Sequence, residues 1–466
     1  MAGILDCRCQ HVNLAAFRKP EPGLVDLLNA LKFLFKPRHA DSAGQNHFLT
    51  KTLPGNEDFS KNRSERPNPE EKFMLKSTTA RVARLVVLSL AFAAQVASAQ
   101  SPIRIGWLSS LTGPLSSAAI AENLGVQFAV DEINAAGGVN GRKLELITRD
   151  TSGEPTKAVN LAKQLAFVDK ADFIIGPVNS GESLATVPIV AKAGIPNLII
   201  GTIDELVDAQ KFPLAFRAIN TNRQWIEAAN DYALNVLKKK KIAVIGDTSG
   251  YGTASSKVAQ DLLDKAGVKP VYLVLVDPNK TDLTDELNKA KAAGADVIMP
   301  WSAATGLLAR LFNTRGDMGW DVPIVGHPAM MAPPVRPLLN KPDYWKNAFA
   351  AGYLSTTYDA KGKLPPRTQA LMDKIRPKLG KGEIDFMFWW IALGYDTVKI
   401  VEHAVKTAGS TDAAAIGKAL ENTKDFAGVY TTYSWSKENR NGFPDHAIVM
   451  NIAGSFKDGS FAAAKR

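Results

Sequence analysis

The stretch "AENLGVQFAVDEINAAGGVNGRKLELITRDT", residues 121–151, decides the fold. Its first part carries apolar residues at helical spacing and stops at a Gly-Gly pair, which predicts a helix that ends there. The "KLELITRDT" part predicts a strand. A helix that leads directly into a strand is the repeating unit of a parallel sheet covered by helices.

The same alternation extends outward from this stretch. It begins at "IRIGWLS" (103–109) and restarts at "KKIAVIGDTSGYG" (240–252). Two runs of one type predict an α/β protein of two similar, Rossmann-like lobes that join near residues 220–223. The part after Phe349 mixes strands with one long helix and is expected to complete both sheets. The first predicted lobe comprises residues 102–220 with 355–433, and the second comprises residues 224–350 with 436–466.

An export signal is predicted upstream of the lobes. "MLKSTTARVARLVVLSLAFAAQVASAQ" (74–100) has basic residues, then an apolar run from Leu85 to Ala94, then Ala97-Ser98-Ala99. This order is typical of a secretory signal peptide from Met74 to Ala99, and the run is too short to span a bilayer. A buried core helix is the alternative, but it does not explain the charges on one side only.

Residues 1–73 precede that signal, although an export signal has to emerge first from the ribosome. We therefore expect Met74 to be the true start and residues 1–73 to be an over-extended reading of the gene or a disordered extension, since much of that part is polar and rich in proline. A genuine cytoplasmic extension is the rival hypothesis. A purified chain that begins at Gln100 would favour export.

Composition excludes several classes of function. The chain has two cysteines, Cys7 and Cys9, so no disulfide, thiol nucleophile or thiolate metal site is expected after Ala99. The net charge of +10 includes one basic run, Lys238–Lys241, which is typical of a solvated helix end. The sequence lacks the basic residues with interleaved aromatic residues that are typical of a nucleic-acid-binding groove.

Small polar loops follow the predicted strands, where α/β sheets bind ligands. They include "LSSLTGP", "GPVNSGES", "IIGTIDE" and "GDTSGYG". Together with "AVDEINAAGGVNGRKLELITRDT" and "FIIGPVNSGESLATVPIVAKAGIP", these loops resemble the periplasmic ligand-binding proteins of ABC importers, branched-chain amino-acid type. The resemblance extends over residues 102–460. It implies the type I fold of two lobes on a three-strand hinge, a periplasmic location, an ABC permease of the inner membrane as partner, and a monomer without cofactor.

The resemblance also implies ligand contacts. In the first lobe a ligand carboxylate would be held by Ser180 and by Gly201 with Thr202, at helix starts that suit anions. Ser180 could instead serve only as the cap of its own helix. The other implied contacts are Ser117, Tyr251, Trp301, Ser302, His327, and Phe386 or Trp390 of "FMFWW". For Trp301, His327 and the "FMFWW" aromatics, a purely structural role is the alternative.

One departure from the family pattern bears on the ligand. Amino-acid binders of this family place a carboxylate in the loop after the "PIVG" strand, but here the loop is "GHPAMMAPP" (326–334), without Asp or Glu. A buried ammonium without a counter-charge is costly. An aromatic, keto or other apolar acid is therefore favoured, and an amino acid is the alternative.

Other classes remain as alternatives. The segment after residue 100 has three histidines without metal spacing, no G-x-S-x-G elbow and no Walker loop, which disfavours an enzyme. A ligand-sensing module is a third hypothesis, although no membrane-spanning or DNA-binding segment follows residue 400. The predicted mechanism is capture of a small carboxylate by lobe closure.

Overall fold

The computed structural model describes residues 101–113, 115–380 and 382–465. The predicted signal peptide and residues 1–73 lie outside the described residues. Among the helices that are described, none has both the length and the apolar character needed to cross a bilayer.

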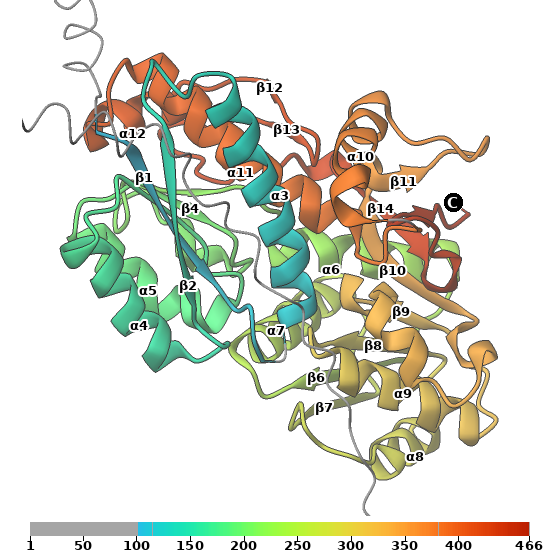
Figure 1. Ribbon diagram of the computed structural model, residues 1–466. Coiled ribbons are helices and arrows are strands. Elements are labelled where there is room, and N and C mark those ends of the chain that lie inside the picture. Colours follow the sequence, from blue (N-terminus) through green and yellow to red (C-terminus); the bar gives the residue numbers. More distant parts are fainter. Residues whose placement is uncertain (1–100, 114, 381, 466) are drawn as a thin grey trace, which may run out of the picture. The chain divides into compact units, whose positions relative to one another are not determined.

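A first sheet contains five parallel strands in the order β2-β1-β3-β4-β5. Helices α4 and α5 lie on one face of this sheet, and α3 and α11 lie on the other (Figure 1). The strands are β1 (Ile103–Ser109), β2 (Leu144–Asp150), β3 (Phe173–Ile175), β4 (Asn197–Ile199) and β5 (Ala215–Arg217). The helices of this lobe are α3 (Ser116–Ala135), α4 (Pro155–Lys163), α5 (Ser180–Lys192), α10 (Pro366–Leu379), α11 (Phe388–Ala408) and α12 (Ala413–Glu421).

Strand β1 shows why this sheet is buried on both faces. Ile105 and Trp107 belong to the core cluster that includes Val126 of α3. Leu108 belongs to a separate cluster with Leu165, which follows α4. Because successive side chains of a strand point to opposite faces, a nearly continuous apolar run results, as is typical of parallel sheets.

A second sheet has six strands in the order β14-β10-β9-β8-β6-β7, of which β14 alone is antiparallel to its neighbour. Its strands are β6 (Ile242–Asp247), β7 (Tyr272–Val276), β8 (Val297–Trp301), β9 (Ile324–Gly326), β10 (Ala348–Tyr353) and β14 (Ile448–Ile452). Its helices are α6 (Asn222–Asp231), α7 (Gly250–Lys265), α8 (Thr284–Ala292) and α9 (Thr305–Asp317). The predicted α/β class with two lobes is confirmed.

The chain passes between the two lobes three times. It crosses after β5, again after β10, and finally before β14, because α11 between the last two packs on α3 of the first lobe. Short strand β11 (Thr357–Tyr358), which follows the second crossing, pairs with β15 (Phe461–Ala462) near the chain end. The predicted division assigns β11 to the first lobe and β15 to the second. The exact limits of the two lobes remain a prediction.

Helices α3 and α11 pack with their backbones close together. A Cβ atom added at Gly125 of α3 would lie 1.9 Å from the carbonyl oxygen of Ile391. At Gly394 of α11, a Cβ would lie 2.1 Å from the carbonyl oxygen of Glu122. Each helix therefore contributes a glycine where the other approaches. This contact positions the start of α11, which carries the aromatic residues of the site.

Asp396 of α11 connects that helix to the segment after β12 (Phe426–Ala427). Its carboxylate accepts hydrogen bonds from the backbone N–H groups of Val429 and Tyr430, both at 2.8 Å, and from the hydroxyl of Tyr433 at 3.1 Å. Burial nevertheless raises the pKa of Asp396 to about 7, because removal from water outweighs these bonds.

This pKa predicts a pH-dependent stability. An Asp that titrates near 7 in the folded chain and near ~3.9 when unfolded binds more protons in the folded state between these values. Its contribution to the free energy of unfolding is therefore fully present below about pH 4 and is lost as pH rises through about 7. Thermal midpoints between pH 4 and 8 should fall less steeply with pH in Asp396→Asn than in the wild type. Equal slopes in the two proteins would contradict the assignment to Asp396.

Candidate functional site

A cavity of about 230 Å³ lies between the two lobes. Strand ends and helix starts of both sheets surround it, as expected for ligand sites of α/β folds. The first lobe contributes Leu115, Ser117, Ala118, Gly153, Val178, Asn179, Ser180, Ile200, Thr202, Ile219, Met387, Trp389 and Trp390. The second lobe contributes Trp225, Asp247, Ser249, Tyr251, Pro278, Ala303, Ala304, Thr305, His327, Ala329 and Ala332.

Two hydroxyls stand together on the first-lobe side. The Ser180 Oγ accepts the backbone N–H of Thr202 at 3.1 Å and lies 3.4 Å from the Thr202 Oγ1. The Thr202 hydroxyl donates to the side-chain oxygen of Asn222. Because the Thr202 hydrogen is used on Asn222, Ser180 is the donor in the long contact between the two hydroxyls, and a ligand acceptor would compete with the Thr202 Oγ1 for that hydrogen.

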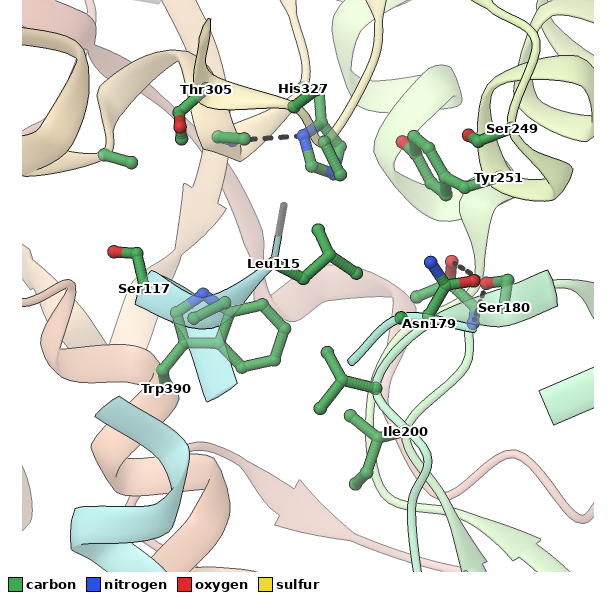
Figure 2. Close-up of a pocket in the computed structure, with 18 of the residues that line it drawn as sticks. Leu115, Ser117, Asn179, Ser180, Ile200, Ser249, Tyr251, Thr305, His327 and Trp390 are labelled. Carbon is green, nitrogen blue, oxygen red and sulfur yellow. Dashed lines mark hydrogen bonds between the residues drawn. The ribbon is translucent and has the colours of Figure 1, made fainter. Parts of the chain in front are cut away.

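The cap of helix α5 is Asn179 and not Ser180. The Asn179 Oδ1 accepts the backbone N–H groups of Gly181 at 2.7 Å and Glu182 at 3.3 Å. Ser180 is the first residue of the helix. The purely structural role considered for Ser180, as a cap, thus belongs to its neighbour, and the Ser180 side chain points into the cavity region (Figure 2).

Three aromatic rings form the second-lobe side. The His327 ring lies 4.8 Å from that of Tyr251 and 4.9 Å from that of Trp225, measured between centroids. Burial lowers the pKa of His327 to about 3, so the imidazole is neutral. Its Nδ1 accepts the backbone N–H of Ala329 at 3.1 Å. The proton of the neutral ring is consequently on Nε2, and His327 can act only as a donor there.

Several other donors around the cavity have no partner. The hydroxyl of Tyr251 and the indole N–H groups of Trp389 and Trp390 are buried without a hydrogen-bond partner among the described residues. Burial also raises the pKa of Tyr251 far above its usual value, so its hydroxyl stays protonated. Trp389 and Trp390 stack with centroids 3.9 Å apart. A ligand rich in acceptors would satisfy such groups, each of which is costly when left unpaired.

Asp247 is the one acidic side chain of the lining, and sequence reasoning missed it. Its Oδ1 accepts the Ser249 N–H at 2.9 Å, and its Oδ2 accepts the Ser302 hydroxyl at 2.5 Å. All these donors are neutral, so none of them places a positive charge beside the carboxyl group. The available signal was its place as the last residue of the strand in "IAVIGD".

The predicted contact residues divide into two groups. Those that line the cavity are Ser117, Ser180, Thr202, Tyr251, His327 and Trp390. Those that lie outside its lining are Gly201, Trp301, Ser302 and Phe386. Trp301 is fully buried in the core, in agreement with the purely structural role that was its alternative. Ser302 donates its hydroxyl to Asp247 and so positions that carboxyl group.

Gly201 has a packing reason for its place behind the lining. A Cβ there would lie 2.7 Å from the Ser183 Oγ and 2.7 Å from the Leu206 Cδ1. Glycine therefore lets the end of β4 approach α5, which brings Thr202 and Ser180 together.

The two lobes touch at one rim of the cavity. The starts of α5 and α7 meet there, and a Cβ added at Gly250 would lie 3.1 Å from the Gly181 Cα. The approach of two glycines without side chains brings Ser180 and Tyr251, one residue away in each helix, to opposite sides of one space (Figure 2). In the described part of the chain, no group of three or more His, Cys, Asp or Glu side chains is placed to hold a metal ion.

Comparison with known proteins agrees with this architecture. The family model described as "Periplasmic binding protein" matches residues 102–455. The "Leu/Ile/Val-binding protein homolog 3" of Brucella melitensis is 28% identical over 75% of this chain and 92% of its own length. An "Amino acid binding protein" of Pseudomonas aeruginosa is 26% identical over 64% of this chain and 76% of its own.

Solved structures show the same fold. The branched-chain amino-acid transporter substrate-binding protein LivJ of Streptococcus pneumoniae, in complex with isoleucine, superposes with a TM-score of 0.67. It is 25% identical and matches over 78% of this chain and 100% of its own. The leucine-binding protein LivK of Thermotoga maritima gives a TM-score of 0.68 at 22% identity, over 78% of this chain and 98% of its own.

Proposed function

Because the chain belongs to the periplasmic binding protein family, we propose that it captures a small carboxylate with an apolar or aromatic body between its two lobes. Its relatives are solute-binding proteins, and the chain is therefore a binding protein and not an enzyme. Delivery to an ABC permease of the inner membrane and export to the periplasm complete the proposal.

The donors of the cavity carry this proposal. Ser180 of the first lobe and Tyr251 and His327 of the second all offer hydrogen and carry no charge. A carboxylate supplies acceptors for donors on both sides, and hydrogen bonds to a charged group are the stronger kind. The stacked Trp389 and Trp390 offer an apolar wall to the body of the ligand.

Closure follows from where these donors lie. A ligand shifts the protein toward the closed form only if it binds that form better than the open one. Contacts from both lobes, with Ser180 on one and Tyr251 on the other, supply this difference. Hinge bending at the three crossings is the motion that would bring them together.

A branched-chain or other amino acid is the second candidate. Asp247 favours it, because a buried carboxylate with only neutral donors could receive a ligand ammonium. The names of the relatives point the same way, since two of them are a Leu/Ile/Val-binding homologue and a protein in complex with isoleucine. The absence of an acid in residues 326–334 does not exclude this candidate, because Asp247 comes from the end of another strand, β6.

Matched ligand pairs would distinguish the two candidates by calorimetry. Phenylpyruvate against phenylalanine, and 4-methyl-2-oxopentanoate against leucine, differ only in the group beside the carboxylate. We expect the oxo acids to bind more tightly and Asp247→Asn to leave their affinity within about threefold, since they carry no ammonium. Tighter binding of the amino acids, lost at least about tenfold in Asp247→Asn, would establish the second candidate instead. Binding of neither series would contradict both.

A further inference from the structure

Among the described residues, strand β7 is an open edge of the second sheet without the usual protection. An edge strand has unpaired backbone N–H and C=O groups, and proteins normally cover such a strand or place charged side chains on it. The sequence "VYLVLV" (271–276) is apolar throughout. Val271, Leu273 and Leu275 are 37%, 40% and 38% exposed, and their spacing places all three on one face of the strand.

The other three edges of the two large sheets follow the rule. Strand β2 carries charged residues, of which Glu145 pairs with Arg104 at 3.2 Å. At β5, the backbone N–H of Arg217 donates to the carbonyl of Arg440. At β14, the N–H of Ala464 donates to the carbonyl of Met450. Strand β7 is the exception, which points to a partner strand.

The register of β7 favours a second copy of this chain as that partner. The N–H of Thr248, just after β6, donates to the carbonyl of Val276. By alternation Val276 and Val274 direct their backbone groups toward β6, and those of Leu273 are directed outward. In an antiparallel pair centred on Leu273, Leu273 of one copy lies opposite Leu273 of the other. These residues could exchange two hydrogen bonds, which is the arrangement that an antiparallel ladder requires.

The charges at the strand ends match the same register. Lys269 precedes the strand, Asp277 follows it, and both are exposed. With Leu273 on the two-fold axis, Lys269 of each copy lies opposite Asp277 of the other, and Val271 lies opposite Leu275. A symmetric interface requires such self-complementarity, and here apolar side chains and opposite charges both meet.

We propose that two copies of this chain pair through their β7 strands, antiparallel about Leu273, and so join their six-stranded sheets into one. This dimer differs from the monomer expected from the sequence. It does not depend on the identity of the ligand.

Sedimentation velocity of the full chain between about 1 and 100 μM tests the proposal. We expect a dimer that Leu273→Lys weakens at least about tenfold, because two like charges would meet on the axis. Val168→Lys, at a position 72% exposed in the other lobe, is the matched control and should leave the dimer intact. Equal thermal midpoints of the variants would show that Leu273→Lys acts on association and not on folding.

Cross-linking gives a second, independent measurement. Residues directly opposite each other in an antiparallel pair have Cβ atoms ~4.5–5.5 Å apart, so Leu273→Cys should form a disulfide-linked dimer on mild oxidation. Val168→Cys should not. In both variants Cys7 and Cys9, the two cysteines of the chain, are replaced by serine. A monomer at every concentration, or equal cross-linking of both variants, would overturn the proposal.

Discussion

Tyr251→Phe is expected to weaken ligand binding while leaving the ligand-free protein at least as stable as the wild type. The Tyr251 hydroxyl is buried and has no partner among the described residues, so its removal deletes an unsatisfied polar group. In the complex, the same hydroxyl would donate to the ligand carboxylate. Loss of a hydrogen bond to a charged group costs ~1–3 kcal/mol, which corresponds to roughly 5- to 150-fold in Kd.

Calorimetry and thermal unfolding together check this prediction. Ser180→Ala, from the other lobe, is the matched control. It should also weaken binding, but it removes the acceptor of the Thr202 N–H and should therefore lower the stability of the free protein. Opposite signs of the stability change, with the same sign of the affinity change, are expected for the pair. An unaltered Kd in Tyr251→Phe would show that the ligand does not use this hydroxyl.

The second large effect is expected at the contact between α3 and α11. Gly125→Ala places a methyl group where the Ile391 carbonyl oxygen stands 1.9 Å away, so the two helices have to separate. Over-packing of a core costs ~1–3 kcal/mol and occasionally more. We expect a loss of about 3 kcal/mol or more in the free energy of unfolding, despite the better helix propensity of alanine, which is worth ~1 kcal/mol.

Denaturant unfolding of Gly125→Ala measures this loss. Gly306→Ala in α9 is the control, because its Cβ would meet only the flexible end of the Arg310 side chain, at 3.2 Å. It should be neutral or slightly stabilising. If Gly125→Ala unfolds at the same denaturant concentration as the wild type, the backbone contact is looser than described.

Much of the fold could be predicted because its signals are local. The helix that ends at Gly137-Gly138 and the strand that follows it, β2, can both be recognised within residues 121–151. The restart at β6 is equally local. The position of the cavity between the lobes could also be predicted, because the carboxyl ends of parallel strands always lie on one edge of their sheet.

The site was harder to predict, because its residues meet from distant parts of the chain. The sequence contains no acid in residues 326–334, yet Asp247 from an earlier strand occupies the same cavity as His327. Trp301 ends a strand in the expected place, but its side chain is fully buried in the core, and the sequence does not reveal which face it takes. The "FMFWW" stretch indicated an aromatic contact, and the start of α11 determines that Trp390, not Phe386, lines the cavity.

The meeting of Gly181 and Gly250 has a consequence for how such a receptor can change. Because a Cβ atom at Gly250 would lie 3.1 Å from the Gly181 Cα of the other lobe, a side chain at this position would press the two lobes apart at the rim. A substitution at this position would thus change ligand affinity although the position does not line the cavity. Ligand selectivity, which depends on the cavity residues, and ligand affinity, which also depends on how closely the lobes approach, can therefore be altered at separate positions.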